Sequence, residues 1–569
     1  MSYFIKKTLK NKGLYLQIYD SSYDASKGYA VQKSYRALGY EKDLIEEGIE
    51  SPLEFFQFEV DELNKERLKE KKAEKFKEIS DVTPEKHLGY FLLKSINDSL
   101  GLKGHIDLLQ SSYPFKCCAY DALSSLIYAR VIEPCSKHRT FYEVLPKLFE
   151  KTDFSEDQMY GLIEFFGWEY EKIIEIYNNF ISKKFGFDTS STYFDCTNFY
   201  FEIDREDSLR RKGPSKERRS DPIVGMGLLL DKNQIPIGMR IFPGNQSEKP
   251  MLQEIIRSLK ETNSIEAKTI RIADKGLNSA SNIYEAICEG DGYIFSKSVK
   301  MLPQIEKTWV LIDDYKDVFD EKGNLLYSIK ECTDDFPYEI NDKNGKKRKI
   351  SLREKRVVSY SPALAKKQRA EINKQVERAK RLRLSEAKRG EYGDSAKFVN
   401  FRAVDDNGEK SKDKIAVSIN HEAVDEALAL AGYNMFVTSE THLSALYIKN
   451  TYHNLWRIEE SFRVMKSYLD ARPVFLQKKE SIIGHFLICY LSVVLIRLLQ
   501  FKVLEDHHSS EEIIDFIRET RLVKQSANKY INISRNSEFT KLLAKNTQLP
   551  ITHYYLSNTQ IKKMLNHRF

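Results

Sequence analysis

The chain has 569 residues, of which 41% are hydrophobic and 30% charged, with 90 basic and 83 acidic side chains and a net charge of +7. This composition is too apolar for a disordered protein, and the length exceeds a single core, so roughly three or four domains are expected. The mildly basic balance is only a weak indication of a nucleic-acid partner. The seven cysteines lack any C-x-x-C spacing, which argues against a disulfide framework or a zinc site and favours reduced thiols in the cytosol.

The N-terminal part of the chain predicts a small β-rich unit followed by helices. Leu14–Tyr19 alternates in polarity, and Lys33–Gly39 fits a second strand. Asp61–Ile79 is laced with Glu and Lys, which predicts a solvated connecting helix. A helical pattern then runs from Pro84 to about Phe185.

Two isolated aspartates stand out further along. Asp195 lies inside Ser191–Glu202, a β-branched and aromatic run that predicts a strand. Asp274 follows the short apolar run Thr269–Ala273 and precedes a Lys-Gly turn. An aspartate at a strand end is usually only a turn former. A carboxylate within an apolar strand is harder to explain as structural, because an unpaired buried carboxylate is costly.

The segment between the two aspartates predicts two more strands and a helix. Ile223–Leu230 and Ile235–Gly244 are apolar runs joined by a polar turn, and Pro250–Glu261 has a helical pattern. The predicted order is therefore three strands, a helix and a fourth strand, followed by a helix over Asn278–Cys288.

Tyr452, Glu459 and Lys466 recur at intervals of seven residues. Seven residues are close to two helical turns, so the three side chains are expected on one face of one helix. A phenol, a carboxylate and an ammonium in a row suit metal and phosphate binding. An ordinary amphipathic helix is the alternative explanation, and Glu460 is the rival acid, although the spacing to Lys466 favours Glu459.

These residues, in this order, resemble the insertion-sequence transposases of the DDE class, in the branch with the Y-R-E-K signature. Tyr452, Glu459 and Lys466 match that signature, while Leu455 stands where it has Arg. Arg463 lies one turn beyond Glu459 and could supply the missing charge, and Arg457 is a poorer substitute.

The resemblance implies an RNase H-like catalytic core that uses two Mg²⁺ ions, for which Mn²⁺ can substitute. Asp195 would bridge both metals, and Asp274 and Glu459 would each hold one. Carboxylate oxygen is the ligand that Mg²⁺ prefers, and two such ions can activate the attacking hydroxyl and stabilise the leaving oxygen. Tyr452 and Lys466 would contact phosphates beside the scissile bond.

Other basic and aromatic residues are candidates for DNA contacts. A basic loop between the first two core strands contains four arginines, Arg210, Arg211, Arg218 and Arg219, which could track a DNA backbone. Lys297 is a further phosphate candidate. Trp309 could stack on an extruded base, although a buried structural role is the commoner one for Trp.

The expected fold class is α/β, with an RNase H-like core, a β-rich insertion, a small N-terminal β unit and helical N- and C-terminal regions. Strand-like Thr308–Ile312 and Leu325–Ile329 and a basic helix over Ala363–Lys388 are expected in the insertion. The expected segments are the N-terminal unit (1–60), a helical end-recognition region (61–185), the first core part (186–297), the insertion (298–431), the second core part with the Glu helix (432–503) and a helical tail (504–569).

The resemblance implies cut-and-paste transposition. The chain would cleave double-stranded DNA at both terminal inverted repeats and join the ends to a target, as a homodimer in the bacterial cytoplasm at the nucleoid. Leu455 keeps a second hypothesis open, namely a catalytically impaired or repurposed DNA-binding protein. A stand-alone RNase H-like nuclease fits the large flanking regions less well. No membrane partner is expected, because the apolar stretch Ile482–Leu499 is interrupted by Gly484, His485 and Arg497 and predicts a buried helix.

Overall fold

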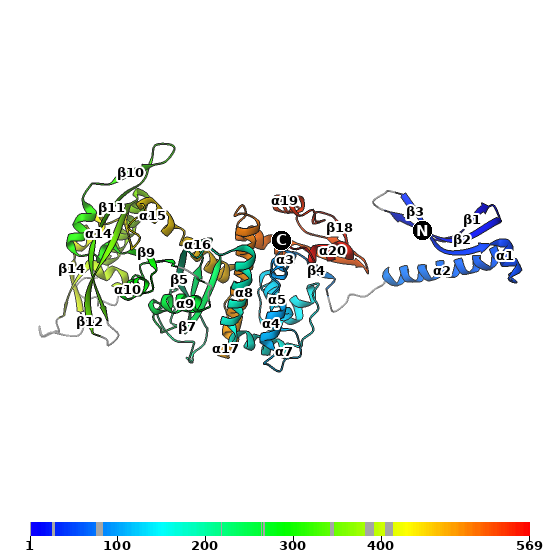
Figure 1. Cartoon of the computed structure of the whole chain (residues 1–569), viewed down its shortest axis with the longest axis horizontal. Coiled ribbons are helices and arrows are strands. Elements are labelled where there is room, and N and C mark those ends of the chain that lie inside the picture. Colours follow the sequence, from blue (N-terminus) through cyan, green and yellow to red (C-terminus); the bar gives the residue numbers. More distant parts are fainter. Residues whose placement is uncertain are drawn as a thin grey trace. The chain divides into compact units, whose positions relative to one another are not determined.

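The chain forms two compact units in the computed structural model, Met1–Thr83 and Pro84–Phe569 (Figure 1). The structure describes residues 2–24, 29–75, 83–217, 219–262, 265, 268–341, 346–381, 392–403 and 414–569.

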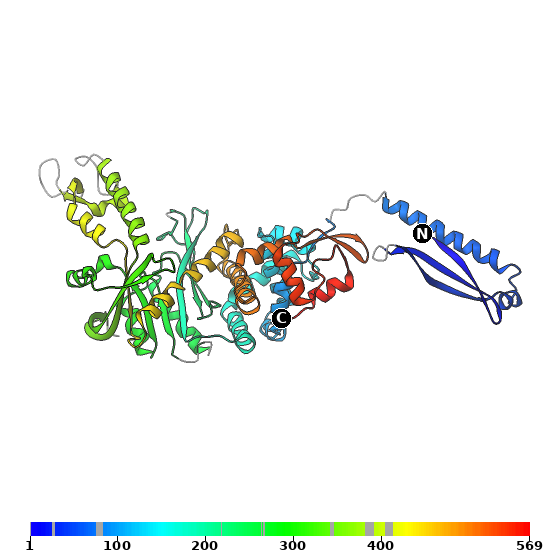
Figure 2. The same cartoon turned by 90° about the horizontal axis from the view of Figure 1, so that it is seen from above.

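The first unit is a three-stranded antiparallel sheet with a long helix along one face (Figure 2). Its elements are β1 (Tyr3–Lys10), β2 (Gly13–Asp24), β3 (Tyr29–Tyr40), α1 (Glu41–Glu46) and α2 (Pro52–Lys75). The two predicted strands are confirmed as parts of β2 and β3. The predicted connecting helix is confirmed as a helix, and its described residues from Asp61 onward are exposed or half-buried, but its predicted start is wrong. It begins at Pro52, and its Phe56 packs with Leu16 of the sheet because the residues before 61 supply an apolar face. Residues 76–79 of that prediction lie outside the described residues.

The second unit is built around a nine-stranded sheet of order β10-β11-β12-β15-β9-β8-β5-β6-β7. Its strands are β5 (Ser191–Tyr200), β6 (Ile223–Leu230), β7 (Pro236–Pro243), β8 (Ile270–Ala273), β9 (Gly292–Lys297), β10 (Lys316–Phe319), β11 (Leu325–Asn341), β12 (Lys347–Tyr360) and β15 (Tyr433–Thr438). Strands β5, β6 and β7 are antiparallel neighbours, whereas β8 and β9 run parallel to β5. The predicted order of three strands, a helix and a fourth strand is confirmed.

Helices cover both faces of this sheet. On one face α9 (Lys249–Glu261) and α10 (Ala280–Cys288) bury an apolar cluster that includes Phe194 and Phe295. On the other face Phe199, Val224 and Leu228 pack toward α17 (Lys479–Leu498). Since β5 contributes Phe194 to one face and Phe199 to the other, the central strands are buried on both sides, which explains their continuous apolar runs.

The helix α17, extended by the π-turn η6 (Leu499–Val503), is the one described helix long and apolar enough to cross a membrane, and the most apolar part of it is 100% buried inside the protein. It packs closely on α7 (Glu156–Trp168), where a Cβ atom at Gly484 would lie 1.9 Å from the Ile163 carbonyl oxygen. The predicted buried helix is confirmed.

The region before the sheet is helical, as predicted, apart from the short strand β4 (Glu85–His87) at its start. Its helices are α3 (Phe91–Ser99), α4 (Lys103–Gln110), α5 (Ala119–Ile132), α6 (Lys137–Arg139), η1 (Thr140–Val144), η2 (Leu145–Lys147), α7 and α8 (Tyr170–Phe185).

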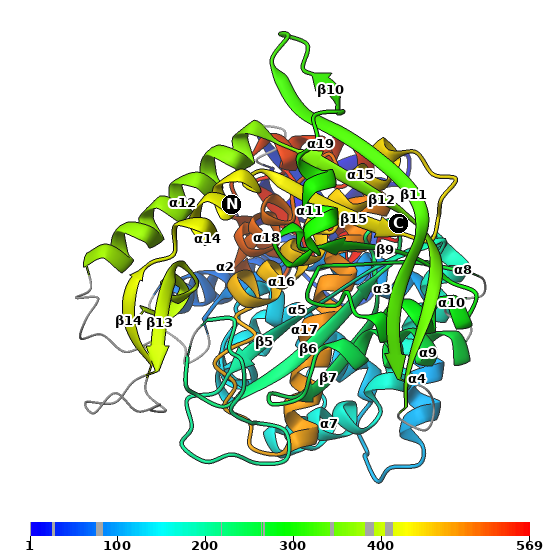
Figure 3. The same cartoon turned by 90° about the vertical axis from the view of Figure 1, so that its left-hand side faces the viewer.

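The segment between β9 and β15 adds strands to the end of the large sheet and places a helical group beside it (Figure 3). Besides β10, β11 and β12 it contains η3 (Val299–Met301), α11 (Gln304–Leu311), α12 (Pro362–Arg381), η4 (Gly393–Phe398), β13 (Val399–Ala403), β14 (Lys414–Ile419) and α14 (His421–Ala429). The predicted strand at Leu325–Ile329 is confirmed within β11. The predicted strand at Thr308–Ile312 is wrong, because this run lies mostly in α11 and buries Val310 in the core. The basic helix is confirmed to Arg381, and residues 382–388 lie outside the described residues.

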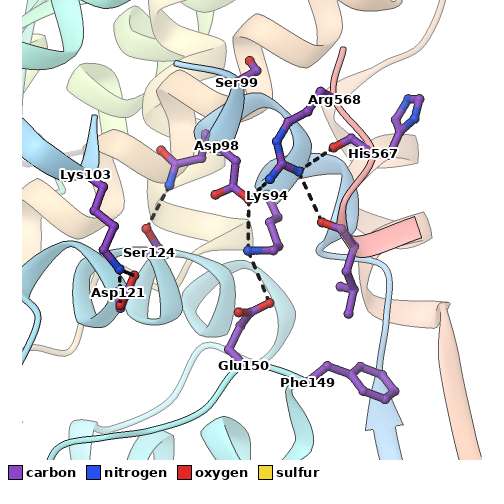
Figure 4. Close-up of polar contacts among 12 residues, drawn as sticks. Lys94, Asp98, Ser99, Lys103, Asp121, Ser124, Phe149, Glu150, His567 and Arg568 are labelled. Atoms are coloured by element: carbon purple, nitrogen blue, oxygen red, sulfur yellow. Dashed lines mark hydrogen bonds and ion pairs between the residues drawn. The ribbon is translucent and has the colours of Figure 1, made fainter. Parts of the chain in front are cut away.

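The sequence predicted a helical C-terminal region, and this prediction is wrong in part, because the region also contains strands. The helices α18 (Ser510–Glu519), α19 (Glu538–Thr547) and α20 (Asn558–Leu565) alternate with β16 (Arg521–Ser526), β17 (Lys529–Asn532) and β18 (Tyr555–Ser557), which form a sheet with β4. Such short strands are specified by pairing with a distant segment, which no local pattern reveals. Arg568 lies 2.8 Å from Asp98 of α3, and Lys94 links Asp98 to Glu150, so the chain end is tied to the helical region (Figure 4).

Candidate active site

Asp195 and Asp274 lie next to each other on neighbouring parallel strands. Asp195 is in β5, and Asp274 directly follows β8. Phe194 is paired with Ala273 in the register of these strands. The two aspartates therefore occupy adjacent positions on two central strands, at the carboxyl end of β8. The sequence predicted both strands, and the parallel pairing brings the two carboxylates together.

The carboxylate of Asp195 is poorly compensated. Its side chain is only 22% exposed, and Lys216 Nζ lies 3.9 Å away. Burial raises the pKa of Asp195 to about 6, with the negative charges of Glu248 and Asp274 adding to the effect and Lys216 opposing it. Buried carboxylates without a full counter-charge resist ionisation. The negative potential at Asp195 therefore favours the binding of an additional cation.

Asp274 is held by two hydroxyl groups. Ser296 Oγ donates to Asp274 Oδ1 over 3.0 Å, and the Tyr452 hydroxyl lies 3.0 Å from the same oxygen. The Tyr452 ring packs on Phe436 at 4.7 Å between centroids, and burial raises the pKa of Tyr452. Tyr452 thus orients a carboxylate, a contact that the sequence did not predict. Ser296 was missed, although a polar residue closing an apolar strand beside β8 was a usable signal.

Tyr452, Glu459 and Lys466 do not lie on one continuous α-helix, which corrects the prediction. The segment divides into α15 (Ala445–His453), α16 (Trp456–Arg463) and the π-turn η5 (Val464–Tyr468). Around residues 454–458 the backbone amides donate to carbonyls three residues back, as in Leu455 N to Tyr452 O at 3.0 Å. This tightening changes the helical phase, and no Gly or Pro marks it in the sequence.

Glu459 and Glu460 have opposite environments although they are adjacent on α16. Glu459 is exposed and lines the cleft described below. Glu460 is 8% exposed and forms ion pairs with Arg497 at 3.3 Å and Arg457 at 3.2 Å. The preference for Glu459 as the candidate acid stays a prediction, and Glu460 serves the core.

A cleft of about 450 Å³ joins the three candidate acids. Its walls come from strands β5, β11, β12 and β15 and from helices α12, α15 and α16. It is lined by Asp195, Asp274, Leu326, Tyr327, Ser359, Ser361, Leu364, Asn434, Phe436, Lys449, Tyr452, His453, Leu455, Trp456 and Glu459. The insertion therefore forms one wall of the candidate site.

Leu455, at which the sequence resemblance predicted a departure from the Y-R-E-K signature, lines the cleft and also belongs to the core. It is 8% exposed and packs in the main apolar cluster.

Lys466 contacts an acidic side chain of the basic loop. Its Nζ lies 3.6 Å from Glu217, which also forms an ion pair with Arg472, and it lies 5.3 Å from the centre of the Phe199 ring. Burial lowers the pKa of Lys466. Glu217 thus pairs with two cations, Lys466 and Arg472, while its neighbour Lys216 lies 3.9 Å from Asp195.

The arginines of the predicted basic loop differ in their contacts. Arg210 is buried and donates to Asp207 and Gln477, so its guanidinium is committed to the fold. Arg219 stacks on Tyr200 at 3.8 Å and pairs with Glu202 at 3.5 Å. The backbone of Arg211 pairs with Ile223. Arg218 lies outside the described residues.

The remaining candidates lie away from the carboxylates or have internal partners. Arg457 pairs with Asp506 at 2.6 Å as well as with Glu460, and Arg463 is exposed at the end of α16. Lys297 lies 3.8 Å from Glu306, and burial lowers its pKa. Trp309 packs partly buried against the core, under Lys330.

The donor set fits a divalent cation in its chemistry, since carboxylate oxygens suit Mg²⁺ and the charge of Asp195 is only partly compensated by Lys216. Among the described residues, however, no group of three or more His, Cys, Asp or Glu side chains is close enough to hold a metal ion. Asp195 and Asp274 are neighbours, and Glu459 shares their cleft without converging on them.

Comparison with known proteins identifies a family for the central part of the chain. The family model described as "Transposase DDE domain" matches residues 204–495, which is more than half of the chain. The match includes Asp274 and Glu459 and begins after Asp195. No curated protein matches the chain.

Among solved structures, the chain is similar to a synaptic complex of piggyBac transposase with hairpin DNA. The two are 9% identical, the similarity covers 75% of this chain and 78% of the other, and the TM-score is 0.35. A TM-score at that level is too low to establish a shared fold.

Proposed function

Because the chain belongs to the family of DDE transposase domains, we propose that it cuts DNA at the two terminal inverted repeats of an insertion sequence and joins the freed ends to a target. The observation that carries this proposal is the cleft that Asp195, Asp274 and Glu459 line together. A surface that is lined by three carboxylates from separate elements and by Lys449 suits metal-assisted phosphodiester chemistry.

The catalytic core would be RNase H-like. In support, three antiparallel strands are followed by two strands parallel to the first, in the spatial order β7-β6-β5-β8-β9. The first aspartate lies on the first strand, the second follows the fourth, and the glutamate lies on a later helix packed on the sheet.

The residues of the cleft divide the work between cation and phosphate binding. Asp195, Asp274 and Glu459 would hold two Mg²⁺ ions, or Mn²⁺ in their place, which supply activation of the attacking hydroxyl and neutralisation of the leaving oxygen. Tyr452 and Ser296 fix the orientation of Asp274 through their hydroxyls. Lys466 would contact phosphate beside the scissile bond, exchanging its ion pair with Glu217 for one with DNA.

Two ends must be cut in one event, so the active form would be a homodimer on double-stranded DNA, acting at the bacterial nucleoid in the cytoplasm. A second candidate function is that of a catalytically impaired, sequence-specific DNA-binding protein. It is favoured by one observation, the buried Leu455 at the position of the signature arginine.

The test is cleavage of a labelled duplex taken from the DNA that flanks the gene, with Mg²⁺ or Mn²⁺. Asp195→Asn, Asp274→Asn and Glu459→Gln should each lower the rate by at least about 10³-fold, since each removes a ligand of the charge-stabilising ions. Glu254→Gln, at a half-buried acid of α9 that lies outside the cleft and pairs with Arg240, is the matched control and should cleave like the wild type.

The two candidate functions give different results in this assay. End-specific binding without cleavage by the wild type would favour the impaired protein, and Leu455→Arg would then be tested for restored cleavage. Cleavage that survives all three acid substitutions would refute the assignment of the site.

A further inference from the structure

The sheet of the N-terminal unit has two unlike faces. On one face Leu16 and Ile18 are fully buried beneath α2. Side chains alternate along a strand, so Tyr15, Gln17 and Tyr19 project from the other face. In β1 the register places Phe4 opposite Tyr19 and Lys6 opposite Gln17. We call this second side, made by β1, β2 and the facing residues of β3, the open face.

Aromatic rings on the open face hold lysine ammonium groups in place. Lys6 Nζ lies 4.6 Å from the centre of the Tyr19 ring, and Lys10 Nζ lies 3.7 Å from that of Tyr15. Tyr15 in turn packs edge-on against Tyr40 at 4.9 Å. Both lysines are exposed, while the rings beneath them are half-buried. The cations are therefore positioned on a rigid surface.

The charges of this unit are sorted between the two faces. On the helix side, Asp20 forms two hydrogen bonds with Arg67, and Glu59 forms an ion pair with Arg36, so acid and base neutralise each other. Among the described side chains of the open face there is no Asp or Glu, because the register pairs its residues only with Lys, Thr, Gln, Ser, Ala and aromatic partners. The open face therefore carries an uncompensated positive charge.

We propose that the open face binds duplex DNA, with Lys6 and Lys10 on phosphates and Gln17 among the polar groups that reach the groove. The major groove admits a β-ribbon, and strand readers of DNA use it in this way. A single strand fits less well, since it needs free aromatic faces for stacking, and here the rings of Tyr15 and Tyr19 are covered by lysines. The charge of the face excludes a basic partner.

This DNA contact is additional to the cleft, because the two lie in different compact units. The inference rests on the proposed function only in taking DNA as the substrate. It fails or survives independently of catalysis, since binding by the open face needs neither the carboxylates nor a metal ion.

The test measures binding of the full-length chain to a labelled duplex in EDTA over a range of salt concentrations. Lys6→Gln with Lys10→Gln should lower the slope of log K against log salt by about 1.8, since each phosphate contact contributes about 0.9. The matched control is Lys7→Gln with Lys69→Gln, two exposed lysines on the helix side, and it should leave the slope unchanged.

Equal losses in the two double variants would overturn the proposal, because they would show a response to net charge alone. An unchanged slope in the open-face variant would also overturn it. So would a larger loss for a single-stranded oligonucleotide than for the duplex, which would assign the face to single strands. A chain with Asp195→Asn should keep the wild-type slope, so loss of cleavage and loss of this contact are separable.

Discussion

The two sides of α16 face regions that differ in how completely their charged side chains are paired. On the cleft side, Asp195, Asp274 and Glu459 share an open space with few counter-charges, and the pKa of Asp195 is raised to about 6. On the core side, Glu460 meets Arg497, whose guanidinium also donates to Ser461, Gln500 and Ser510. Both regions contain buried or half-buried charge within the same elements.

This difference distinguishes charged residues that stabilise the fold from charged residues that remain free to bind a ligand. In the core-side cluster, each charge has a partner of opposite sign, as buried charges require. In the cleft, the carboxylates lack full pairing with cations. This lowers the stability of the folded protein, yet the carboxylates are present. Perturbed carboxylates in a cleft are a mark of function, which is why the cleft, and not the better-ordered cluster, is the candidate site.

The sharpest way to break this comparison is to neutralise the adjacent acids one at a time. Glu460→Gln should destabilise the protein by about 3 kcal/mol, because it leaves the buried Arg497 without its counter-charge. Glu459→Gln should leave stability within about 0.5 kcal/mol of the wild type, as for other exposed positions. Urea unfolding followed by circular dichroism measures both.

In the cleavage assay, the same two variants should show the opposite order of effects. Glu459→Gln should abolish cleavage in a folded protein, and Glu460→Gln should cleave at the wild-type rate below its own melting temperature. If Glu460→Gln were as stable as Glu459→Gln, the division into a structural and a functional side of α16 would be wrong.

A second prediction concerns the stability cost of Asp195. Its pKa is raised from an ordinary 3.8 to about 6 by burial, so the folded protein binds a proton more tightly than the unfolded chain. Between pH 4 and 6 the folded state retains that proton and the unfolded state has lost it. The free energy of unfolding therefore falls as pH rises through this window, by about 2 kcal/mol.

Asp195→Asn should remove this cost. At pH 7.5 the variant should melt several degrees higher than the wild type, and at pH 4 the two should coincide. Mg²⁺ should raise the melting temperature of the wild type and leave that of the variant nearly unchanged, since a ligand stabilises only the state that binds it. Equal melting temperatures at both pH values would contradict the assignment.

The smallest effect is expected at Glu217, which pairs with Lys466 and Arg472. Glu217→Gln frees two cations, and partly exposed ion pairs of this kind are worth about 0.2–1 kcal/mol. Affinity for duplex DNA should therefore rise by a few fold in EDTA, as measured by fluorescence anisotropy. Glu202→Gln, which releases only Arg219 at the loop end, is the control. A decrease in affinity for Glu217→Gln would mean that Glu217 positions these cations for DNA instead of competing with it.

Much of the core could be predicted because its signals are local. The apolar runs of β6 and β7 and the helical patterns of α9 and α10 were recognised within a residue or two. Asp195 and Asp274 were noticed as polar residues in apolar strands, and the parallel register of β5 and β8 makes them neighbours.

The remainder depended on contacts between distant segments. The tightened turn near Leu455 carries no Gly or Pro, so the helix was predicted as continuous. The pairing of β16 with β4 joins residues from the two ends of the second unit. The role of Arg210 was misjudged because its partner Gln477 is far away in sequence. Charged residues in a loop look alike until their partners are known.

The burial of α17 has a consequence for how the chain is made. The helices α5 and α7, against which it packs, leave the ribosome several hundred residues before α17 is synthesised. At elongation rates of about 5–20 residues per second, their apolar faces remain without their partner for tens of seconds. The nascent chain must therefore expose surface that other proteins can capture, and a truncation before residue 479 should yield insoluble protein. The order of synthesis thus makes this helix a late addition to the core, followed only by the C-terminal helices and strands that pack on the same cluster.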